Sequence, residues 1–281
     1  MAEARSGWWT LCWSERYEGG LIMRILLLAN NWVGWQITQW LGARGETIAG
    51  VVVHPDDKQK YRDEILRSAG LENACMFSAR SLHQPETLAA IRSLDAEIAV
   101  SIFFGYILRA EFLNLFSAGC VNLHPALLPY NRGAHPNVWS IIEGTPAGAT
   151  LHSIDAGVDT GDIIAQAEVE VEAVDTGETL YRRLEHASVE LFESAWPSIR
   201  AGKALRTAQS QRSGTSHRAK DIERIDEIDL EATYKAKELI DLIRARTFRP
   251  YPGAYFRSQG KKIYLHLDLA YEQGTAQNSD G

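Results

Sequence analysis

Cysteine is scarce in this chain of 281 residues, with single residues at positions 12, 75 and 120. Three scattered cysteines are too few for a disulfide framework, and no group of Cys and His has the spacing of a zinc site. We therefore expect a protein of a reducing compartment, the cytoplasm, with no bound metal.

Long apolar runs and an excess of positive charge are also missing. No stretch of 18 or more apolar residues occurs, so the sequence predicts no membrane span. The net charge of −7 disfavours a protein that holds nucleic acid on a broad basic face. The rest of the composition, 45% hydrophobic and 23% charged, is that of a globular protein long enough for one large α/β domain and an appendage.

Several catalytic motifs are absent as well. The stretch ANNWVGW after the first apolar run supplies only Gly34, so the Gly-x-Gly-x-x-Gly fingerprint of dinucleotide-binding proteins is not present. The sequence has neither a Walker-type glycine-lysine loop nor a Gly-x-Ser-x-Gly elbow. These absences disfavour a dehydrogenase, a P-loop ATPase and a serine hydrolase of the common α/β type.

The first 22 residues differ from the rest of the chain. They contain acidic residues and three tryptophans, but no apolar core of a secretory signal and no small-residue cleavage site. We interpret residues 1–22 as an N-terminal extension, with an aromatic interaction arm as the alternative. Met23 then begins MRILLLAN, which is typical of a buried strand.

From Met23 onward, apolar runs alternate with helical patterns. Strands are expected at 23–30, 46–54, 75–77, 97–104 and 119–124, and helices at 35–44, 56–70, 85–94 and 108–116. This alternation predicts βαβ units and an α/β fold, with a doubly wound, mostly parallel, Rossmann-like sheet.

The second half of the sequence has a different pattern of expected elements. A loop is expected at 126–137, helices at 136–143 and 179–199, and strands at 149–155 and 162–173. We predict a catalytic domain over 23–205 and, over 206–281, a linker and a small C-terminal α+β unit. In that part, 206–220 is the polar linker and 230–246 the last helix.

Polar residues follow two of the expected strands, where open parallel sheets bind ligands. Asn122 and His124 are two positions apart, so both side chains point to one side of the strand. Asp159, in a glycine-containing turn, could orient that imidazole or raise its pKa. Amide, imidazole and carboxylate together suit acyl transfer, because they supply oxyanion donors and a base. On residue types and spacing alone, turn formers and a core histidine are the favoured interpretation.

Two segments carry a family resemblance: NLHPALLPYNRG at 122–133 and ATLHSIDAGVDTGDII at 149–164. Together they closely resemble the folate-dependent formyltransferases, and the resemblance covers about residues 23–205. It implies that Asn122, His124 and Asp159 are the catalytic residues and that N10-formyltetrahydrofolate is the formyl donor.

The resemblance also implies a mechanism. An amine of the acceptor attacks the formyl carbon, and the Asn122 amide and a protonated His124 hold the oxyanion. Asp159 supports His124 and helps move the proton to the leaving folate nitrogen. The folate is expected to lie along Ile154–Asp159, including Asp155, and against the segment formed by Phe104, Gly105, Tyr106 and Ile107.

The identity of the acceptor amine is the part of the proposed reaction that the sequence defines least. The stretches at 129–155 and 246–256 are most similar to sugar-nucleotide N-formyltransferases, which implies a nucleoside-diphosphate amino sugar. Glycinamide ribonucleotide and methionyl-tRNA formyltransferases are alternatives. They are disfavoured because the glycine/serine phosphate loop is missing after the first strand, and because the C-terminal unit is short and the chain acidic. A formyltetrahydrofolate hydrolase is a further alternative, disfavoured because no N-terminal regulatory domain precedes the sheet.

Residues in the loop beyond His124 are expected to meet the acceptor. They are Tyr130, Asn131, Arg132 and His135, with Arg132 as the candidate diphosphate contact and a solvated loop arginine as its alternative. His152 is expected to pack under the site. The short C-terminal unit predicts a homodimer, because a two-stranded element next to an apolar helix commonly needs a partner. A non-catalytic folate- or nucleotide-binding module is the alternative from another class.

Overall fold

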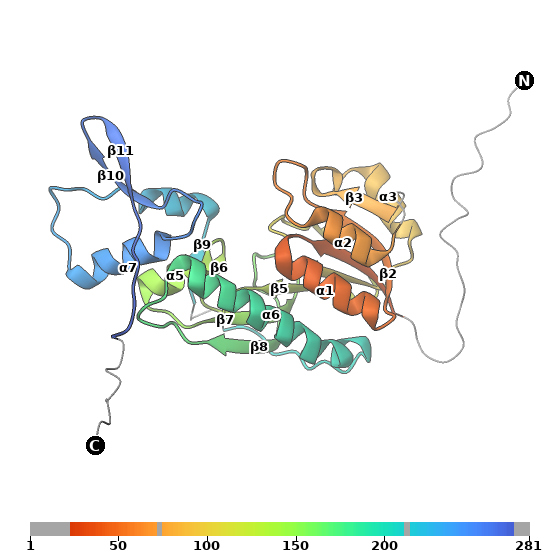
Figure 1. Ribbon diagram of the computed structural model, residues 1–281. Helices are drawn as coiled ribbons and strands as arrows, with labels where there is room; N and C mark the ends of the chain where they lie inside the picture. The colour runs from red at the N-terminus through yellow and green to blue at the C-terminus, as the bar shows by residue number, and fades with distance from the viewer. Residues whose placement is uncertain (1–22, 72–74, 211–213, 273–281) are drawn as a thin grey trace, which may run out of the picture. The chain divides into compact units, whose positions relative to one another are not determined.

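The computed structural model describes residues 23–71, 75–210 and 214–272, so the predicted extension at 1–22 lies outside the described residues. The chain divides into two compact units. One runs to Asn122 and includes residues 200–202, and the other comprises Leu123–Ile199 and the chain from Lys203 onward (Figure 1).

The first unit is built from parallel strands that are apolar on both faces. Its elements are β1 (Arg24–Ala29), α1 (Asn31–Ala43), β2 (Thr47–Val53), α2 (Arg62–Ala69), β3 (Met76–Ser78), the 3₁₀ turn η2 (Ala79–Ser81), α3 (Pro85–Ser93), β4 (Ile98–Ile102) and α4 (Ala110–Leu113). β1 pairs in parallel with β2 and with β4, and β2 pairs in parallel with β3. Because both faces of these strands are covered, their sequences are continuous apolar runs.

β5 (Gly119–His124) continues from this unit into the second one, which contains short strands and longer helices. The remaining elements are β6 (Arg132–Gly133), α5 (Pro136–Glu143), β7 (Ala147–Ser153), β8 (Ile163–Val169), α6 (Gly177–Arg200), β9 (Ser216–His217), the 3₁₀ helix η3 (Ala219–Arg224), α7 (Ala236–Arg246), β10 (Ala254–Ser258) and β11 (Lys261–Leu265). α5, α6 and α7 share a core in which Ile141, Leu184 and Ala245 are buried.

The strand order of the main sheet is β3-β2-β1-β4-β5-β7-β8. β8 runs antiparallel to β7, while the pairs among β1 to β4 are parallel. The first five positions have the 3-2-1-4-5 arrangement of doubly wound folds. The predicted α/β class and mostly parallel sheet are therefore confirmed, as is a small C-terminal unit with the antiparallel pair β10–β11.

Some element boundaries differ from expectation for local reasons. α1 begins at Asn31, four residues earlier than expected, because the Asn31 side-chain oxygen accepts hydrogen bonds from the N–H of Val33 and Gly34. α7 begins at Ala236 and not at residue 230. Asp229 accepts from the Glu231 N–H and its own N–H donates to the Tyr234 hydroxyl, which favours a turn over a helix there.

The polar stretch expected as a linker also differs. Thr207 forms an isolated bridge with Ile163, and β9 pairs in parallel with β6. This stretch is therefore hydrogen-bonded to the rest of the second unit.

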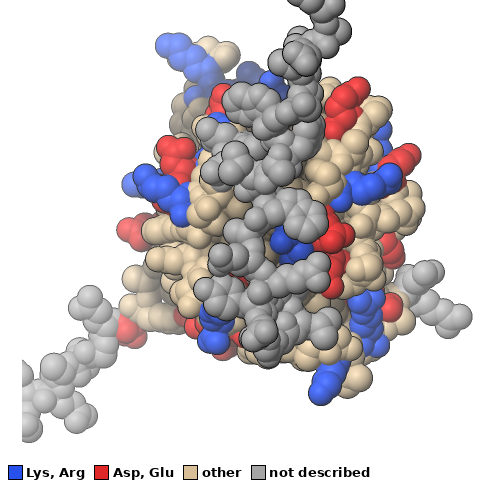
Figure 2. Space-filling view, turned by 90° about the vertical axis from the view of Figure 1, so that its right-hand side faces the viewer, with Lys and Arg blue, Asp and Glu red and all other residues tan. Residues whose placement is uncertain are grey.

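Charge is mixed on one face of the molecule. On the face shown in Figure 2, lysine and arginine side chains are interspersed with aspartate and glutamate. Within the described ranges, no helix combines the length and the hydrophobicity needed to cross a bilayer.

Candidate active site

The site begins at the end of β5, where Asn122 and His124 lie two positions apart on one side of the strand. His124 is buried, while Asn122 is partly exposed. The buried residues Val121 and Leu123 alternate with these two and fix the register of the strand end. The sequence prediction that both polar side chains share one side is consistent with this strand.

Asp159 is presented by the loop between β7 and β8. The Asp155 carboxylate accepts hydrogen bonds from the Gly157 N–H at 3.0 Å and from the Thr160 hydroxyl at 2.6 Å, which closes the loop on itself. Asp159 itself has a left-handed backbone conformation, with φ of 53°. Asp155, expected to contact the folate, is exposed, and its side chain in this structure stabilises the loop that carries Asp159.

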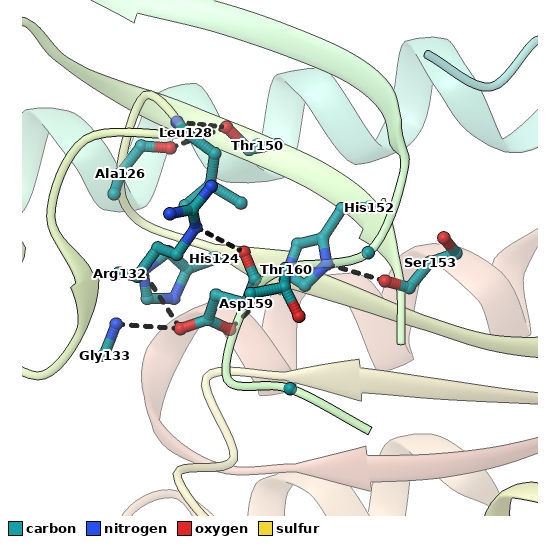
Figure 3. A network of polar contacts seen from close by, with 12 residues as sticks. His124, Ala126, Leu128, Arg132, Gly133, Thr150, His152, Ser153, Asp159 and Thr160 are labelled. Carbon is teal, nitrogen blue, oxygen red and sulfur yellow. Dashed lines mark hydrogen bonds and ion pairs between the residues drawn. The ribbon is translucent and has the colours of Figure 1, made fainter. Parts of the chain in front are cut away.

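The Asp159 carboxylate lies between two imidazoles (Figure 3). Its Oδ2 is 3.6 Å from His124 Nε2 and its Oδ1 is 3.5 Å from His152 Nε2. The Gly133 N–H donates to Oδ2 at 2.9 Å. The two imidazole distances exceed hydrogen-bond length, and such catalytic contacts often tighten only when the reacting groups bind.

Burial and charge oppose each other in this cluster. Burial lowers the pKa of His124, and the Asp159 charge and the Asn131 carbonyl raise it without cancelling that effect. For Asp159, burial favours the neutral acid, but the two imidazoles and the Gly133 N–H outweigh it and leave the pKa well below its usual range. These directions favour an ionised Asp159 beside a neutral His124. The protonated His124 expected from the resemblance concerns the step in which the oxyanion forms, and it stays a prediction.

His152 participates in the cluster more directly than the sequence suggested. Its Nδ1 is 2.8 Å from the Ser153 carbonyl oxygen, an acceptor only, so that nitrogen carries hydrogen. Its Nε2 faces the Asp159 carboxylate, so a proton placed there would lie between the imidazole and Asp159.

Arg132 and Gln209 form the second layer of the site. The Arg132 Nε–H points to the Asp159 carbonyl at 3.2 Å and to Gln209 Oε1 at 3.1 Å, and its Nη2 donates to Gln209 Oε1 at 2.8 Å. Gln209 Nε2 in turn donates to the carbonyls of Asp159 and Gly161. Arg132 is therefore an ordered, half-buried side chain and not a solvated loop arginine.

The other expected acceptor residues divide into two groups. Tyr130 is half-buried and His135 is exposed, at the N-terminus of α5. The Asn131 side chain is buried, with only 1% exposed. It donates to Ser140 and Thr145 and accepts from the Thr215 hydroxyl. Its amide thus holds the loop together and faces the interior, contrary to the expectation of an acceptor contact.

The segment after β4, expected to meet the folate, belongs to the first unit. Phe104 is buried, Tyr106 is half-buried, and Gly105 and Ile107 are exposed. The His54 ring packs on Phe104 and Tyr106 at centroid distances of 5.1 and 5.0 Å and hydrogen-bonds the Phe104 carbonyl. The segment is therefore held in place by a histidine that follows β2.

A cavity of about 650 Å³ opens in the first unit at the carboxyl ends of β2 and β3. Arg62 and Arg80 line it, and each forms an ion pair with an exposed aspartate, Asp56 and Asp57 respectively. The Arg62 Nε–H is buried and has no hydrogen-bond partner among the described residues. The cavity therefore offers guanidinium donors to an anion. In the same described ranges, no group of three His, Cys, Asp or Glu side chains could hold a metal ion.

Sequence reasoning missed Gln209, Thr215 and His54. Gln209 and Thr215 lie in a polar stretch without a periodic pattern, and nothing local distinguishes them from linker residues. His54 had a weak signal, since it directly follows a strand whose carboxyl end faces the ligand side of such sheets.

The comparisons with known proteins agree with this geometry. Residues 39–195, more than half of the chain, match the model of the formyl transferase family, and residues 221–271 match that of the N-formyltransferase dimerization C-terminal domain. The chain belongs to the formyl transferase family, and it is a formyltransferase enzyme. The resemblance seen in the sequence is confirmed.

The relatives differ in the acceptor that their names state. A methionyl-tRNA formyltransferase of Halothermothrix orenii is 34% identical over 228 residues, which are 79% of this chain and 70% of that protein. A 4-N formyltransferase of Francisella tularensis superposes with a TM-score of 0.77 at 27% identity, covering 90% of this chain and all of that one. The formyltransferase PseJ of Anoxybacillus kamchatkensis is 31% identical with a TM-score of 0.52, covering 72% of this chain and 88% of that one. It was solved with UDP-4,6-dideoxy-4-formamido-L-AltNAc and tetrahydrofolate.

Proposed function

We propose that the protein transfers a formyl group from N10-formyltetrahydrofolate to the amino group of an amino-deoxysugar nucleotide. One observation carries this choice of acceptor. The Francisella tularensis 4-N formyltransferase is covered over its whole length, and the C-terminal residues 221–271 match the N-formyltransferase dimerization domain.

The donor assignment is supported by the tetrahydrofolate bound to PseJ, which is 31% identical to this chain. In this protein we assign folate contacts to the segment Phe104–Ile107 and to the loop that Asp155 closes.

The catalytic roles follow from the protonation states in the cluster. The acceptor nitrogen attacks the formyl carbon, and the neutral His124 imidazole accepts the proton that the amine loses. The ionised Asp159 stabilises the resulting imidazolium, and the Asn122 amide donates to the oxyanion. The carbon–N10 bond then breaks, and His124 returns the proton to N10 of the leaving tetrahydrofolate.

Phosphate groups of the acceptor need cationic partners, and the chain offers two sets. Arg132 is ordered beside Asp159, and Arg62 and Arg80 line the cavity at β2 and β3. Their aspartate partners in the cavity are more than half exposed, so phosphate oxygens can replace them at low cost. Arg80→Ala is expected to raise KM for the acceptor while KM for the folate stays unchanged.

Methionyl-tRNA is the second candidate acceptor, because the sequence relatives at 29–34% identity carry that name. Against it stands the net charge of −7, since tRNA binding depends strongly on neutralising phosphates. On the part of the surface that is visible in Figure 2, lysine and arginine side chains are interspersed with aspartate and glutamate.

The test is a turnover assay with N10-formyltetrahydrofolate against 3-amino and 4-amino deoxysugar nucleotides, with glycinamide ribonucleotide and methionyl-tRNA as competing acceptors. Folate release is followed by absorbance and the product by mass. A gain of one formyl group on a sugar nucleotide, lost in His124→Ala and retained in the exposed α6 variant His186→Ala, supports the proposal. Formylation of methionyl-tRNA alone would replace it.

The C-terminal unit is proposed as a homodimer contact, supported by the dimerization-domain match at 221–271. Tyr251, Ile263 and Tyr264 expose between 42% and 46% of their surface there, which suits burial against a second copy. Gel filtration at micromolar concentration should give the mass of two chains. The cytoplasm stays the predicted location.

A further inference from the structure

After α6, the chain passes beside the loop that carries Asp159. A backbone bridge fixes this part of the chain there. Ile163 and Thr207 exchange two N–H···O hydrogen bonds of 2.8 Å each. This bridge places Gln209, two residues further on, beside the loop that ends at Ile163. The position of Gln209 is therefore set by the backbone, independently of its own side chain.

The Gln209 amide joins two elements of the site. Its Nε2 donates to the carbonyl oxygens of Asp159 at 2.9 Å and Gly161 at 2.7 Å. Its Oε1 accepts twice from Arg132, at 3.1 and 2.8 Å. Both donors and the acceptor are used, so the orientation of the amide is fixed by its partners.

The two sets of Gln209 contacts affect the position of the Asp159 carboxylate by two routes. The loop backbone that Gln209 holds carries Asp159, and Arg132 precedes Gly133, whose N–H donates to Asp159 Oδ2. A neutral amide suits this place, because it offers donors to the carbonyls and an acceptor to the guanidinium. A glutamate would keep the acceptor, lose both donors and bring a negative charge toward Asp159.

We infer that Gln209 is a positioning residue, which ties the Asp159 loop to Arg132 and so keeps the carboxylate between His124 and His152. The inference deepens the proposed function, on which it rests. In this arrangement the residue contributes to the reaction through Asp159, and the electrostatic effect of Asp159 on His124 depends on it.

The test compares Gln209→Ala and Gln209→Glu with Gln166→Ala. Gln166 is a matched control, because its Nε2 also donates two hydrogen bonds, to the Leu128 carbonyl at 2.8 Å and to the Thr150 hydroxyl at 2.9 Å, without contacting Asp159. Thermal unfolding measures the structural loss in each variant. Steady-state kinetics across pH measures kcat, KM for each substrate and the acid limb of kcat/KM.

For both Gln209 variants, kcat is expected to fall about 10- to 100-fold, because a displaced catalytic group loses most of its effect. KM for the folate should change little. Asp159 raises the pKa of His124, so its displacement in Gln209→Ala should move the acid limb to lower pH. Gln166→Ala should lower Tm and leave the acid limb in place. A Gln209→Ala enzyme with the kcat and acid limb of the parent, and only a lower Tm, would overturn the inference.

A second measurement separates this inference from the proposed function. NMR titration of the His124 ring needs no substrate, so it reports even if no acceptor in the panel is formylated. A shift of the His124 midpoint to lower pH in Gln209→Ala, but not in Gln166→Ala, supports the positioning role. Equal midpoints in all three proteins would contradict it.

Discussion

The loop between β7 and β8 and the segment after α6 both meet at Asp159, but they contribute in different ways. The loop supplies the carboxylate, and its own side chains and glycines shape it. The segment contributes supporting contacts through its described residues. It contacts the loop backbone through Gln209 and the Asn131 turn through Thr215. In the proposed mechanism, one region carries the chemistry and the other holds it in place.

The largest expected effect lies in the cluster itself. His124→Ala removes the base, and Asp159→Asn removes the charge that stabilises its protonated form. Each should lower kcat about 10²- to 10³-fold or more, the range measured for a lost transition-state contact. Turnover at saturating substrates measures the loss, with the exposed variant His186→Ala as the control. An Asp159→Asn enzyme whose kcat is within threefold of that of the parent enzyme would show that the loop does not supply a catalytic group.

A pair of glycine substitutions should separate the two regions. A Cβ at Gly161 would lie 1.8 Å from the Ser153 carbonyl oxygen, and one at Gly214 would lie 2.2 Å from the Pro129 carbonyl oxygen. Both alanine variants should lose about 1–3 kcal/mol of stability, since the backbone must shift to make room. We expect kcat to fall strongly in Gly161→Ala and little in Gly214→Ala.

Urea unfolding and kinetics on the same two preparations measure this difference. If kcat fell equally in both variants, the segment at Gly214 would be as closely tied to the chemistry as the loop is.

The smallest expected effect is a movement of the pH profile, in opposite directions for two variants. Burial sets the His124 pKa below its ordinary value of 6.5, so the neutral base should persist on the acid side of that value. The Asp159 charge raises this pKa and the His152 charge lowers it. The acid limb of kcat/KM should thus move to lower pH in Asp159→Asn and to higher pH in His152→Gln.

An acceptor amine titrates in the same range, so the ring of His124 should be followed by NMR in parallel. If the His124 pKa shifted in the same direction in both variants, the charges of Asp159 and His152 would not act on His124 in the opposite ways expected.

Most of the fold was predictable because its determinants are local. Apolar runs such as Arg24–Ala29 and helix starts such as Pro136 carry their structure in a few consecutive residues. The candidate catalytic residues were predictable for the same reason, since Asn122 and His124 share one short motif and Asp159 lies in another.

The remaining parts of the site depend on contacts between residues far apart in the chain. Gln209 contacts Arg132 across 77 residues and Thr215 contacts Asn131 across 84, and no pattern near either residue marks such a partner. The direction of the His124 pKa was not predictable either, because burial, which only the folded structure reveals, outweighs the charge of its neighbour.

The pairing of β6 with β9 has a consequence for the order of folding. It consists of two residues on each strand and closes a loop of more than 80 residues, which costs on the order of 4 kcal/mol in chain entropy. Each backbone hydrogen bond returns about 1 kcal/mol, so the pair is expected to form only after α5 and α6 have packed. On the ribosome, Asn122, His124 and Asp159 are synthesised long before Ser216 and His217. We therefore expect a growing chain to hold every catalytic group before it becomes a competent enzyme.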